Sequence, residues 1–512
     1  MAWGLLNIQS SLIFSVRLFV YLRYCAKIAK TTMKNIIRFV AIIISLSCPI
    51  CSMAATEEPY DTLRTLKIPL LTITTVDGAE PQGFPIYPPE GCVGVGLTGN
   101  EYVQGRLVIT LGDSVLYDSG EYMNNKSGMQ IRQRGNTSAL WNKKPYKINL
   151  AKKADLLFRE DEKYRDKDWI LLREGLTMNV PVGFKVSELV GQRWTPQYSY
   201  VNLIINNDYK GCYILTEAIG VEEGRCNIAN TGFIIEDDAY WWNETVSFQG
   251  NLLPPQMGYT FKSPAPDDIT TPTYNRIKNY ILEVENALPN EEQIYDYIDT
   301  RSFAAWLLGH DILGTLDAAG SNRYLVKHDY IVGNPTSTLL EMGPLWDFDD
   351  SYKREGMWSQ QHSGNYKFYY KYLLDDSKFT DEYKDIWYNI SSTLYSDMVD
   401  FCSNFRDSIG TDIDISRQLD DKRWGRVVPT KTVDEDVEFV SAWFGSRVTW
   451  INNEIHTVTG VDDIVVEENI SKHTTDVYLL NGFLYMNNAT PEQLEQLPAG
   501  IYIAGGRKLV IK

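Results

Sequence analysis

Two hydrophobic patterns follow one another along the chain after its first 55 residues. Residues 56–130 contain short apolar runs broken by Gly, Pro and Asn, which is typical of strands. In the segments 274–312, 377–410 and 433–456, apolar residues recur instead every three or four positions, which predicts helices. A strand-rich region followed by a helical region favours an α+β fold.

Two segments predict β-hairpins. The runs YVNLII and CYILTE flank a turn at residues 206–211 that is rich in Asn, Asp and Gly. The runs NRYLVKHDYIV and TSTLLEMGPLW flank a second turn, Gly333-Asn334-Pro335. Residues 461–512 alternate again, with a Gly505-Gly506 turn, and predict a small all-β module.

The N-terminal segment has the order of a secretory signal. Cations after Met33 precede an apolar run at 39–51 and the small residues Ser52, Ala54 and Ala55. We therefore take Met33 as the start, treat 1–55 as an extension plus signal peptide, and expect export to the periplasm, outer membrane or exterior. Cleavage near Ala54 or Ala55 and lipoprotein processing at Cys48 both remain open. No transmembrane span is predicted in the mature chain.

Composition excludes several classes of protein. With 512 residues, 44% hydrophobic and 22% charged, the chain is long and apolar enough for a large core, which excludes a disordered chain. Residues 1–55 hold six cations and no acid, so the remainder carries 43 cations against 66 acids, a net charge of −23. Such a chain repels nucleic acid, and a phosphate ligand would need a local basic pocket or a divalent metal.

Four cysteines remain after processing: Cys92, Cys212, Cys226 and Cys402. Their spacing, without a CxxC pair or a Cys/His set, argues against a zinc site. For Cys212 and Cys226 a disulfide and a pair of buried thiols are both open.

The segment 311–352 carries the most informative polar residues. Asp317 opens a loop, Asn322 precedes the second predicted hairpin, and Asp347 and Asp349 follow it. A hairpin places the start of its first strand beside the end of its second, so these four side chains are expected at one end. Their oxygens suit Mg²⁺ or Mn²⁺.

The order Asp-x₄-Asn, then Asp-Phe-Asp, repeats an arrangement used for phosphoryl transfer. There one Asp accepts the proton of an attacking hydroxyl, while the Asn and another Asp hold metal ions that neutralise nucleotide phosphates. The alternative is that these residues only end strands and cap turns. The combined pattern favours phosphoryl transfer.

The segment 131–153 is basic within an acidic protein. We expect Arg134, beside a Gly-Asn-Thr turn, and Lys144 or Lys147, at the start of the strand YKINL, to contact nucleotide phosphates. Glu217, at the end of CYILTE, is a carboxylate that could fix the lysine. The alternative is a solvated basic edge strand. The GVGLTG segment matches a glycine-rich phosphate loop but lacks the flanking elements such a loop needs.

With these motifs in hand, the chain resembles the CotH family, the spore-coat-H-like atypical secreted protein kinases. The resemblance covers about residues 65–450. It is carried by these segments, in chain order: Arg134-Gly135-Asn136-Thr137-Ser138, Lys143-Lys144-Pro145-Tyr146-Lys147, Lys167-Asp168-Trp169-Ile170-Leu171-Leu172, Tyr209-Lys210-Gly211-Cys212-Tyr213-Ile214-Leu215-Thr216-Glu217, Gly232-Phe233-Ile234-Ile235-Glu236 and Gly343-Pro344-Leu345-Trp346-Asp347-Phe348-Asp349.

The resemblance implies a two-lobed, kinase-like fold with a strand-rich lobe and a helical lobe, which uses ATP and Mg²⁺ or Mn²⁺ to phosphorylate protein Ser or Thr. Position by position, Asp317 matches the catalytic aspartate, Asp347 the metal-binding aspartate, and Lys144 the lysine before the strand. The family's Arg-Asn pair is replaced here by Asn179-Val180. That departure supports an alternative, a non-catalytic surface or assembly protein on a kinase-like scaffold.

The resulting expectation is a strand-rich part at 56–130, a kinase-like core at 131–455 and the β-rich module at 461–512. The module resembles C-terminal sorting modules of secreted Bacteroidota proteins through the segments LPAGIY and KLVIK. A glycoside hydrolase using two of the Asp residues is a third hypothesis, but it would leave Asn322 and the lysine cluster without a role. The sequence holds no signal of oligomeric state.

Overall fold

The computed structural model of this protein describes residues 58–315, 318, 322–352, 368–458, 475–479, 484–490, 493–494, 497, 500–504 and 507–511. Contacts divide the chain into residues 1–62 and 63–512. Of the first unit only the start of helix α2 (Glu58–Thr65) is described, so the predicted signal peptide lies outside the described residues. The elements described next all belong to the second unit.

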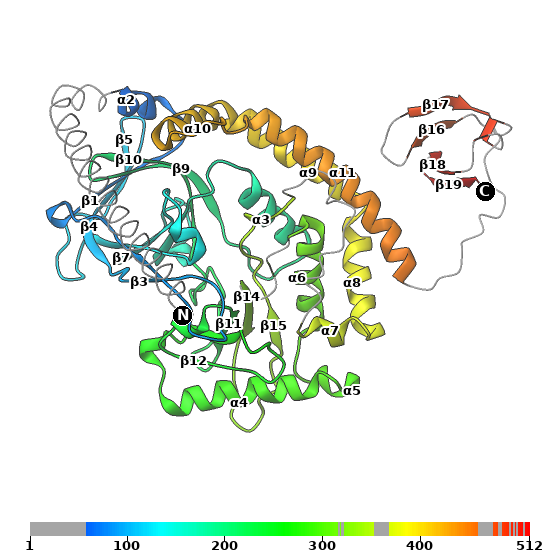
Figure 1. Cartoon of the computed structure of the whole chain (residues 1–512), viewed down its shortest axis with the longest axis horizontal. Coiled ribbons are helices and arrows are strands. Elements are labelled where there is room, and N and C mark those ends of the chain that lie inside the picture. Colours follow the sequence, from blue (N-terminus) through cyan, green and yellow to red (C-terminus); the bar gives the residue numbers. More distant parts are fainter. Residues whose placement is uncertain are drawn as a thin grey trace, which may run out of the picture. The chain divides into compact units, whose positions relative to one another are not determined.

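A closed barrel dominates the strand-rich region (Figure 1). Seven described strands close it in the order β1, β9, β10, β8, β7, β6, β4 and back to β1, and β5 extends it from β4. All neighbours are antiparallel except β1 and β9. The strands are β1 (Leu70–Thr75), β4 (Val103–Leu111), β5 (Ser114–Asp118), β6 (Met129–Gln133), β7 (Tyr146–Ala154), β8 (Asp166–Leu172), β9 (Tyr198–Ile205) and β10 (Asp208–Glu217).

Alternation along each strand fills the barrel interior. In β7, Tyr146, Ile148 and Leu150 belong to one buried cluster, whereas Lys147 between them is half-buried and points to the other side of the wall. The predicted hairpin β9–β10 is confirmed, and its two-residue turn is Asn206-Asn207, with φ of 51° and 63°. Asn tolerates this left-handed conformation, which two-residue hairpins require. A separate pair, β2 (Phe84–Ile86) and β3 (Gly96–Thr98), is also antiparallel.

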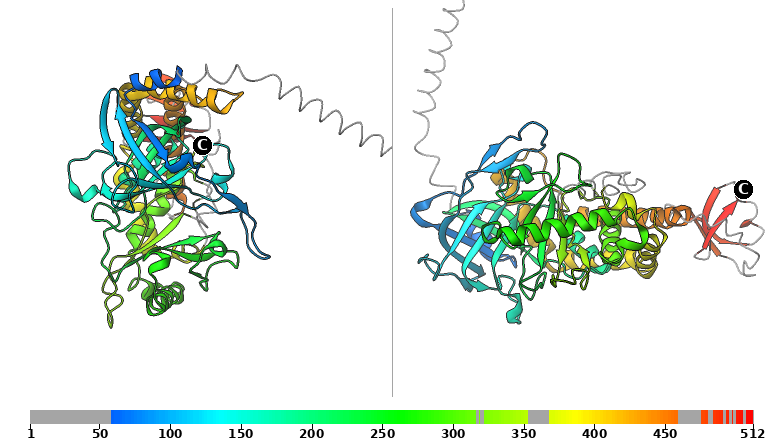
Figure 2. Two further views of the ribbon diagram at one scale, coloured as in Figure 1. Left: turned by 90° about the vertical axis from the view of Figure 1, so that its left-hand side faces the viewer. Right: turned by 90° about the horizontal axis from the view of Figure 1, so that it is seen from below.

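A second, antiparallel sheet has the order β12-β13-β11-β14-β15. Its strands are β11 (Phe233–Asp238), β12 (Ser247–Phe248), β13 (Gly258–Ser263), β14 (Arg323–Lys327) and β15 (Leu340–Met342). The β14–β15 pairing confirms the second predicted hairpin. One face of the sheet packs on helix α4 (Thr271–Ala287), where Phe233 meets Tyr280 edge to face and the Tyr259 hydroxyl donates to Glu285 at 2.8 Å. In Figure 2 the green helix α4 is seen end-on in the left view and lengthwise in the right view.

The predicted helical segments are confirmed. Their helices are α4, α5 (Glu291–Ile294), α6 (Thr300–Leu313), α8 (Ser377–Ile390), α9 (Leu394–Phe405) and α11 (Val433–Val458), with the short α7 (Tyr370–Leu373) before α8. Three further α-helices lie outside the predicted segments: α2, in the region 56–130 that was expected to form strands, α3 (Asn179–Leu189), whose sequence contains a proline and three valines, and α10 (Thr411–Trp424), which is mostly polar. None of the described helices is long and apolar enough to cross a bilayer.

The C-terminal residues form an antiparallel sheet of four described strands in the order β17-β16-β18-β19. They are β16 (Thr475–Leu479), β17 (Leu484–Ala489), β18 (Gly500–Ala504) and β19 (Arg507–Ile511), and a small cluster around Val477 and Tyr502 forms the core. The predicted Gly505-Gly506 turn lies outside the described residues, between two strands that do pair. The resemblance to sorting modules stays a prediction.

Candidate functional site

The second sheet has one apolar and one polar face because strand residues alternate. Odd-numbered residues such as Phe233 and Tyr259 pack toward α4. Even-numbered residues form the opposite face, which we call the polar face. Its members are Glu236 and Asp238 on β11, Thr260 and Lys262 on β13, and Tyr324 on β14. Lys262 pairs with Glu236, Thr260 donates to Asp238, and Tyr324 interacts electrostatically with both acids, so the polar face is an organised set of side chains.

Asn322 and Asp347 meet at one end of this face, as the hairpin predicted. The amide Nδ2 of Asn322 donates to Oδ2 of Asp347 at 3.0 Å. Both residues have left-handed backbones, with φ of 70° and 64°. A non-glycine residue in that region is uncommon, and such conformations concentrate at functional sites, where surrounding contacts hold them.

Glu236 links this pair to the rest of the polar face. Its Oε1 accepts the backbone N–H of Asn322 at 3.0 Å, and its Oε2 lies 2.6 Å from Nζ of Lys262. Asp238 accepts the hydroxyl of Thr260 at 3.2 Å and the backbone N–H of Tyr240 at 2.8 Å. Burial, reinforced by the Glu236 carboxylate, raises the pKa of Asp238 to about 7.

The loop between β6 and β7 approaches the polar face from the barrel. Arg134 interacts electrostatically with the hydroxyl of Tyr324. The carboxylates of Glu236, Asp347 and Asp238 also act on that hydroxyl. Burial raises the pKa of Tyr324, and Arg134 opposes that rise. One turn further, the hydroxyls of Thr137 and Tyr240 are 2.9 Å apart. The predicted residues Arg134 and Asp347 therefore both act electrostatically on Tyr324 of the polar face.

The Asp-Phe-Asp segment is anchored from α3. The side chain of Asn179 donates to the carbonyls of Phe348 at 3.0 Å and Ser351 at 3.3 Å. The Phe348 ring lies so close to Gly183 that a Cβ there would approach it to 2.2 Å, so only glycine fits. Asn179 thus holds the backbone that directly follows Asp347.

Asp349 points to a different neighbour from Asp347. Its carboxylate acts electrostatically on Glu174. Burial raises the pKa of Glu174, and the negative charge of Asp349 raises it further, whereas the positive charge of Arg173 lowers it. No contact between Asp349 and Asn322 is found among the described residues.

The predicted pairing of Glu217 with Lys144 or Lys147 does not form. Glu217 is fully buried at the end of β10, on the interior side of the barrel, and pairs with Arg159 at 2.8 Å. Lys147 projects from the other side of the wall and pairs with Asp168 at 3.1 Å. Lys144 donates to the carbonyl of Ala139 at 2.7 Å, and burial lowers its pKa. Because side chains alternate between the two sides of the barrel wall, Lys147 lies on the outside and Glu217 on the inside, which keeps the two apart.

The predicted catalytic Asp317 lies outside the described residues. Within the described part of the chain, no three His, Cys, Asp or Glu side chains are grouped as a metal site. The donors that do meet are the carboxylate of Asp347 and the amide of Asn322, and oxygen donors of these types are the ones Mg²⁺ and Mn²⁺ prefer. The pair thus fits a divalent ion whose other ligands come from substrate phosphates or water.

The glycine-rich segment 94–99 has a packing role. A Cβ at Gly94 would come within 2.4 Å of the Tyr240 ring, and Trp242 donates its indole N–H to the carbonyl of Val93 at 3.0 Å. Packing against the Tyr240 ring thus explains why position 94 is a glycine, and no phosphate ligand is needed to explain it.

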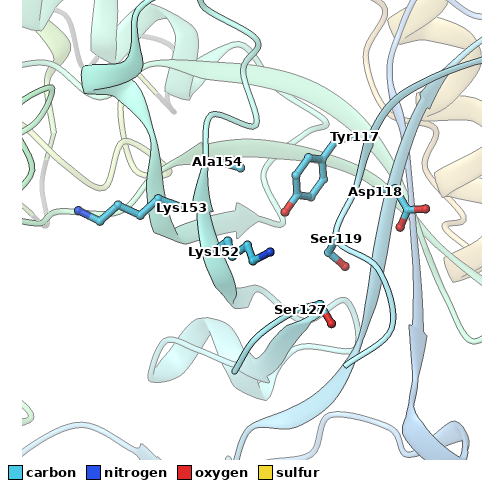
Figure 3. Close-up of a pocket in the computed structure, with 8 residues that line it drawn as sticks. Tyr117, Asp118, Ser119, Ser127, Lys152, Lys153 and Ala154 are labelled. Carbon is cyan, nitrogen blue, oxygen red and sulfur yellow. The ribbon is translucent and has the colours of Figure 1, made fainter. Parts of the chain in front are cut away.

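A surface hollow of about 270 Å³ lies elsewhere on the barrel, between the β5–β6 connection and the end of β7 (Figure 3). Lys152 points toward Ser119 and Ser127 there, while Lys153 points away and pairs with Glu222 at 2.5 Å. None of the residues that lines the hollow belongs to the polar face. We therefore place the candidate site on the polar face, where charged groups converge.

His310 on α6 lies beneath the Asp-Phe-Asp segment and supplies a pH-dependent prediction. Its ring lies 4.3 Å from Trp306 and stacks on Phe348, and neither ring nitrogen has a hydrogen-bond partner among the described residues. Burial, helped by the charge of Arg323, lowers the pKa of His310 to about 3. Arg323 is itself paired with Asp237.

We expect stability to fall as the pH drops, because the unfolded chain protonates this histidine near pH 6.5 and the folded protein does not until about pH 3. The loss from this group between pH 6.5 and pH 4.5 is about 2–3 kcal/mol. In urea unfolding curves across that range, His310→Phe should show a flatter pH dependence than wild type. Parallel curves for the two proteins would contradict the assignment.

Sequence reasoning missed Glu236 and Lys262 as members of the site, and also Asn179 as its anchor. The available signal was the strand FIIEDD, in which acidic residues at alternate positions must share one face. Lys262 had no comparable signal, since its partner is on another strand.

The cysteines take no part in the site. Cys212 and Cys226 are free and buried, and burial raises the pKa of each to about 12. Of the two alternatives left open by their spacing, the structure has the buried thiols.

Comparison with known proteins agrees with these motifs. No curated protein matches the chain. A family profile described as CotH kinase protein matches residues 131–451, which is more than half of the chain and includes both the β6–β7 loop and the polar face. The protein therefore belongs to the CotH kinase family.

Proposed function

We propose that this protein is a secreted or surface-attached protein kinase that transfers phosphate from ATP to Ser or Thr of another protein, using Mg²⁺ or Mn²⁺. The observation that carries the proposal is the Asn322–Asp347 pair, held in left-handed backbones at 3.0 Å beside a polar face, in a chain of the CotH kinase family. The signal-like segment at 33–55 supports export.

In the proposed reaction the acceptor hydroxyl oxygen bonds to the γ-phosphorus as the bond to the β–γ bridging oxygen breaks, and ADP leaves with that oxygen. The hydroxyl proton passes to a carboxylate, a role that the resemblance gives to Asp317. Asp347 and Asn322 would hold a divalent ion, with Asp349 as a further candidate ligand. When bound, the ion supplies charge neutralisation for the phosphates.

The test is incubation of the purified protein with γ-labelled ATP and a protein acceptor such as dephosphorylated casein, with Mg²⁺, Mn²⁺ or EDTA. Wild type should incorporate label only with metal, and Asp317→Ala should abolish incorporation while leaving the unfolding midpoint close to wild type. Equal incorporation with and without metal would contradict the proposal. Absence of metal-dependent nucleotide binding would favour the alternative, a non-catalytic surface or assembly protein on this scaffold.

A further inference from the structure

A lysine–glutamate pair does exist beside the Asn322–Asp347 pair, on the polar face and not on the barrel. Lys262 lies 2.6 Å from Glu236, Glu236 accepts the N–H of Asn322 at 3.0 Å, and Asn322 donates to Asp347 at 3.0 Å. A cation is therefore connected to the proposed metal-holding carboxylate by an unbroken series of polar contacts.

Exposure differs sharply between the two members of the pair. The side chain of Lys262 is 33% exposed, whereas that of Glu236 is 9% exposed. The carboxylate thus serves as a buried anchor, while part of the lysine side chain is exposed to solvent. An ammonium has three donors, so the contact to Glu236 leaves others for a ligand.

Lys262 keeps its charge in this setting. Burial disfavours the ammonium, but Glu236 and Asp238 outweigh burial and raise the pKa of Lys262 above its ordinary value. The carboxylates also restrict a long flexible side chain, which reduces the conformational entropy lost when a ligand binds.

The lysines predicted from sequence have other partners: Lys147 forms an ion pair with Asp168, and Lys144 donates to a backbone carbonyl. Arg134 acts on Tyr324 and Lys262 acts on Asp238, so both bring positive charge to the polar face. In a mature chain with a net charge of −23, a phosphate ligand needs such a local positive group.

We propose that Lys262 binds the phosphate chain of the nucleotide, and that Glu236 is a positioning residue which orients Lys262 and fixes the backbone of Asn322. This inference rests on the proposed function. The phosphate contact would then come from Lys262 on the second sheet, whereas the sequence pattern predicted it from Lys144 or Lys147 on the barrel.

The test compares the affinities for ATP with Mg²⁺ and for adenosine, measured by isothermal titration calorimetry on the full protein. Lys262→Met should weaken ATP binding about tenfold or more, the loss of a charge-assisted hydrogen bond, with adenosine affinity within about twofold of wild type. Lys262→Arg keeps the charge and should retain most ATP affinity. The matched control is Lys153→Met, which breaks the surface pair with Glu222 and should change neither affinity.

Lys262→Met leaves a buried carboxylate unpaired, so the double variant Glu236→Gln/Lys262→Met is measured beside it. Gln keeps an acceptor for the Asn322 N–H without the unpaired charge, and this variant should show the same selective loss of ATP affinity. Glu236→Gln alone should lower kcat for phosphoryl transfer more than it raises the KM for ATP, as expected of a positioning residue.

Unchanged ATP affinity in both Lys262→Met and the double variant Glu236→Gln/Lys262→Met would overturn this inference and leave the kinase proposal standing. An equal loss of ATP and adenosine affinity would also overturn it, since a general structural role has that effect. Wild-type protein that binds no ATP would overturn both proposals, so the two failures are distinguishable.

Discussion

Asp347→Asn should reduce phosphoryl transfer about a hundredfold or more while the protein stays folded. Asn has almost the same volume as Asp and equally tolerates the left-handed backbone that position 347 adopts, with φ of 64°. The amide oxygen can still accept from Nδ2 of Asn322, so the local hydrogen bond survives. What disappears is the negative charge that would hold the ion, and losing one preorganised electrostatic contact to the transition state costs about 10²–10³ in rate.

The measurement is the initial rate of label incorporation at saturating ATP, together with the midpoint of urea unfolding. Asp113→Asn is the matched control, because Asp113 lies in the β4–β5 turn and not on the polar face; its rate should equal wild type. A rate for Asp347→Asn within threefold of the control would remove Asp347 from the proposed site. Raising Mg²⁺ or Mn²⁺ should recover part of the lost rate if the charge acts through a metal ion.

Asp420→Ala should destabilise the protein by about 3–5 kcal/mol, the range for a buried ion pair that loses one partner. Asp420 on α10 is fully buried and pairs with Lys143 at 2.5 Å, and its Oδ2 also accepts the backbone N–H of Cys212 on β10 at 2.9 Å. Lys143 in turn donates to the carbonyl of Cys212. Removing the carboxylate leaves a buried ammonium without its counter-ion and a strand N–H without its acceptor.

The readout is the shift in the urea unfolding midpoint. Asp161→Ala breaks a Lys–Asp pair of the same kind on the surface, with Lys163 at 3.0 Å, and should shift the midpoint far less. The double variant Lys143→Met/Asp420→Leu should be more stable than Asp420→Ala, because no unpaired charge remains. An Asp420→Ala midpoint equal to that of Asp161→Ala would show that the buried pair does not hold α10 to the barrel.

The hairpins show what a single sequence can deliver. The turn residues at 206–207 and 333–335 mark where each chain reversal occurs, and reversal alone brings residue 322 beside residue 347. This part of the candidate site was predictable because it depends on local turn chemistry and antiparallel geometry.

The partners of the lysines could not be predicted in the same way. Which strand faces which is decided by barrel closure, through pairings between residues far apart in sequence such as β1 with β4 and β9. Arg159, the true partner of Glu217, lies in the irregular segment between β7 and β8 and has no periodic pattern to place it. The parity of Lys147 within YKINL was readable from sequence, and it already excluded the interior position that Glu217 occupies.

The division of the second sheet into two faces separates two kinds of evolutionary change. Substitutions at the even-numbered positions 236, 238, 260, 262 and 324 alter charges and hydrogen bonds, but they leave the contacts between the opposite face and α4 in place. A scaffold built in this way can lose or exchange its chemistry by point mutation and still fold. Inserting one residue into FIIEDD would instead turn the acidic side chains into the core, so lineages of this fold should vary at these positions by replacement and not by length.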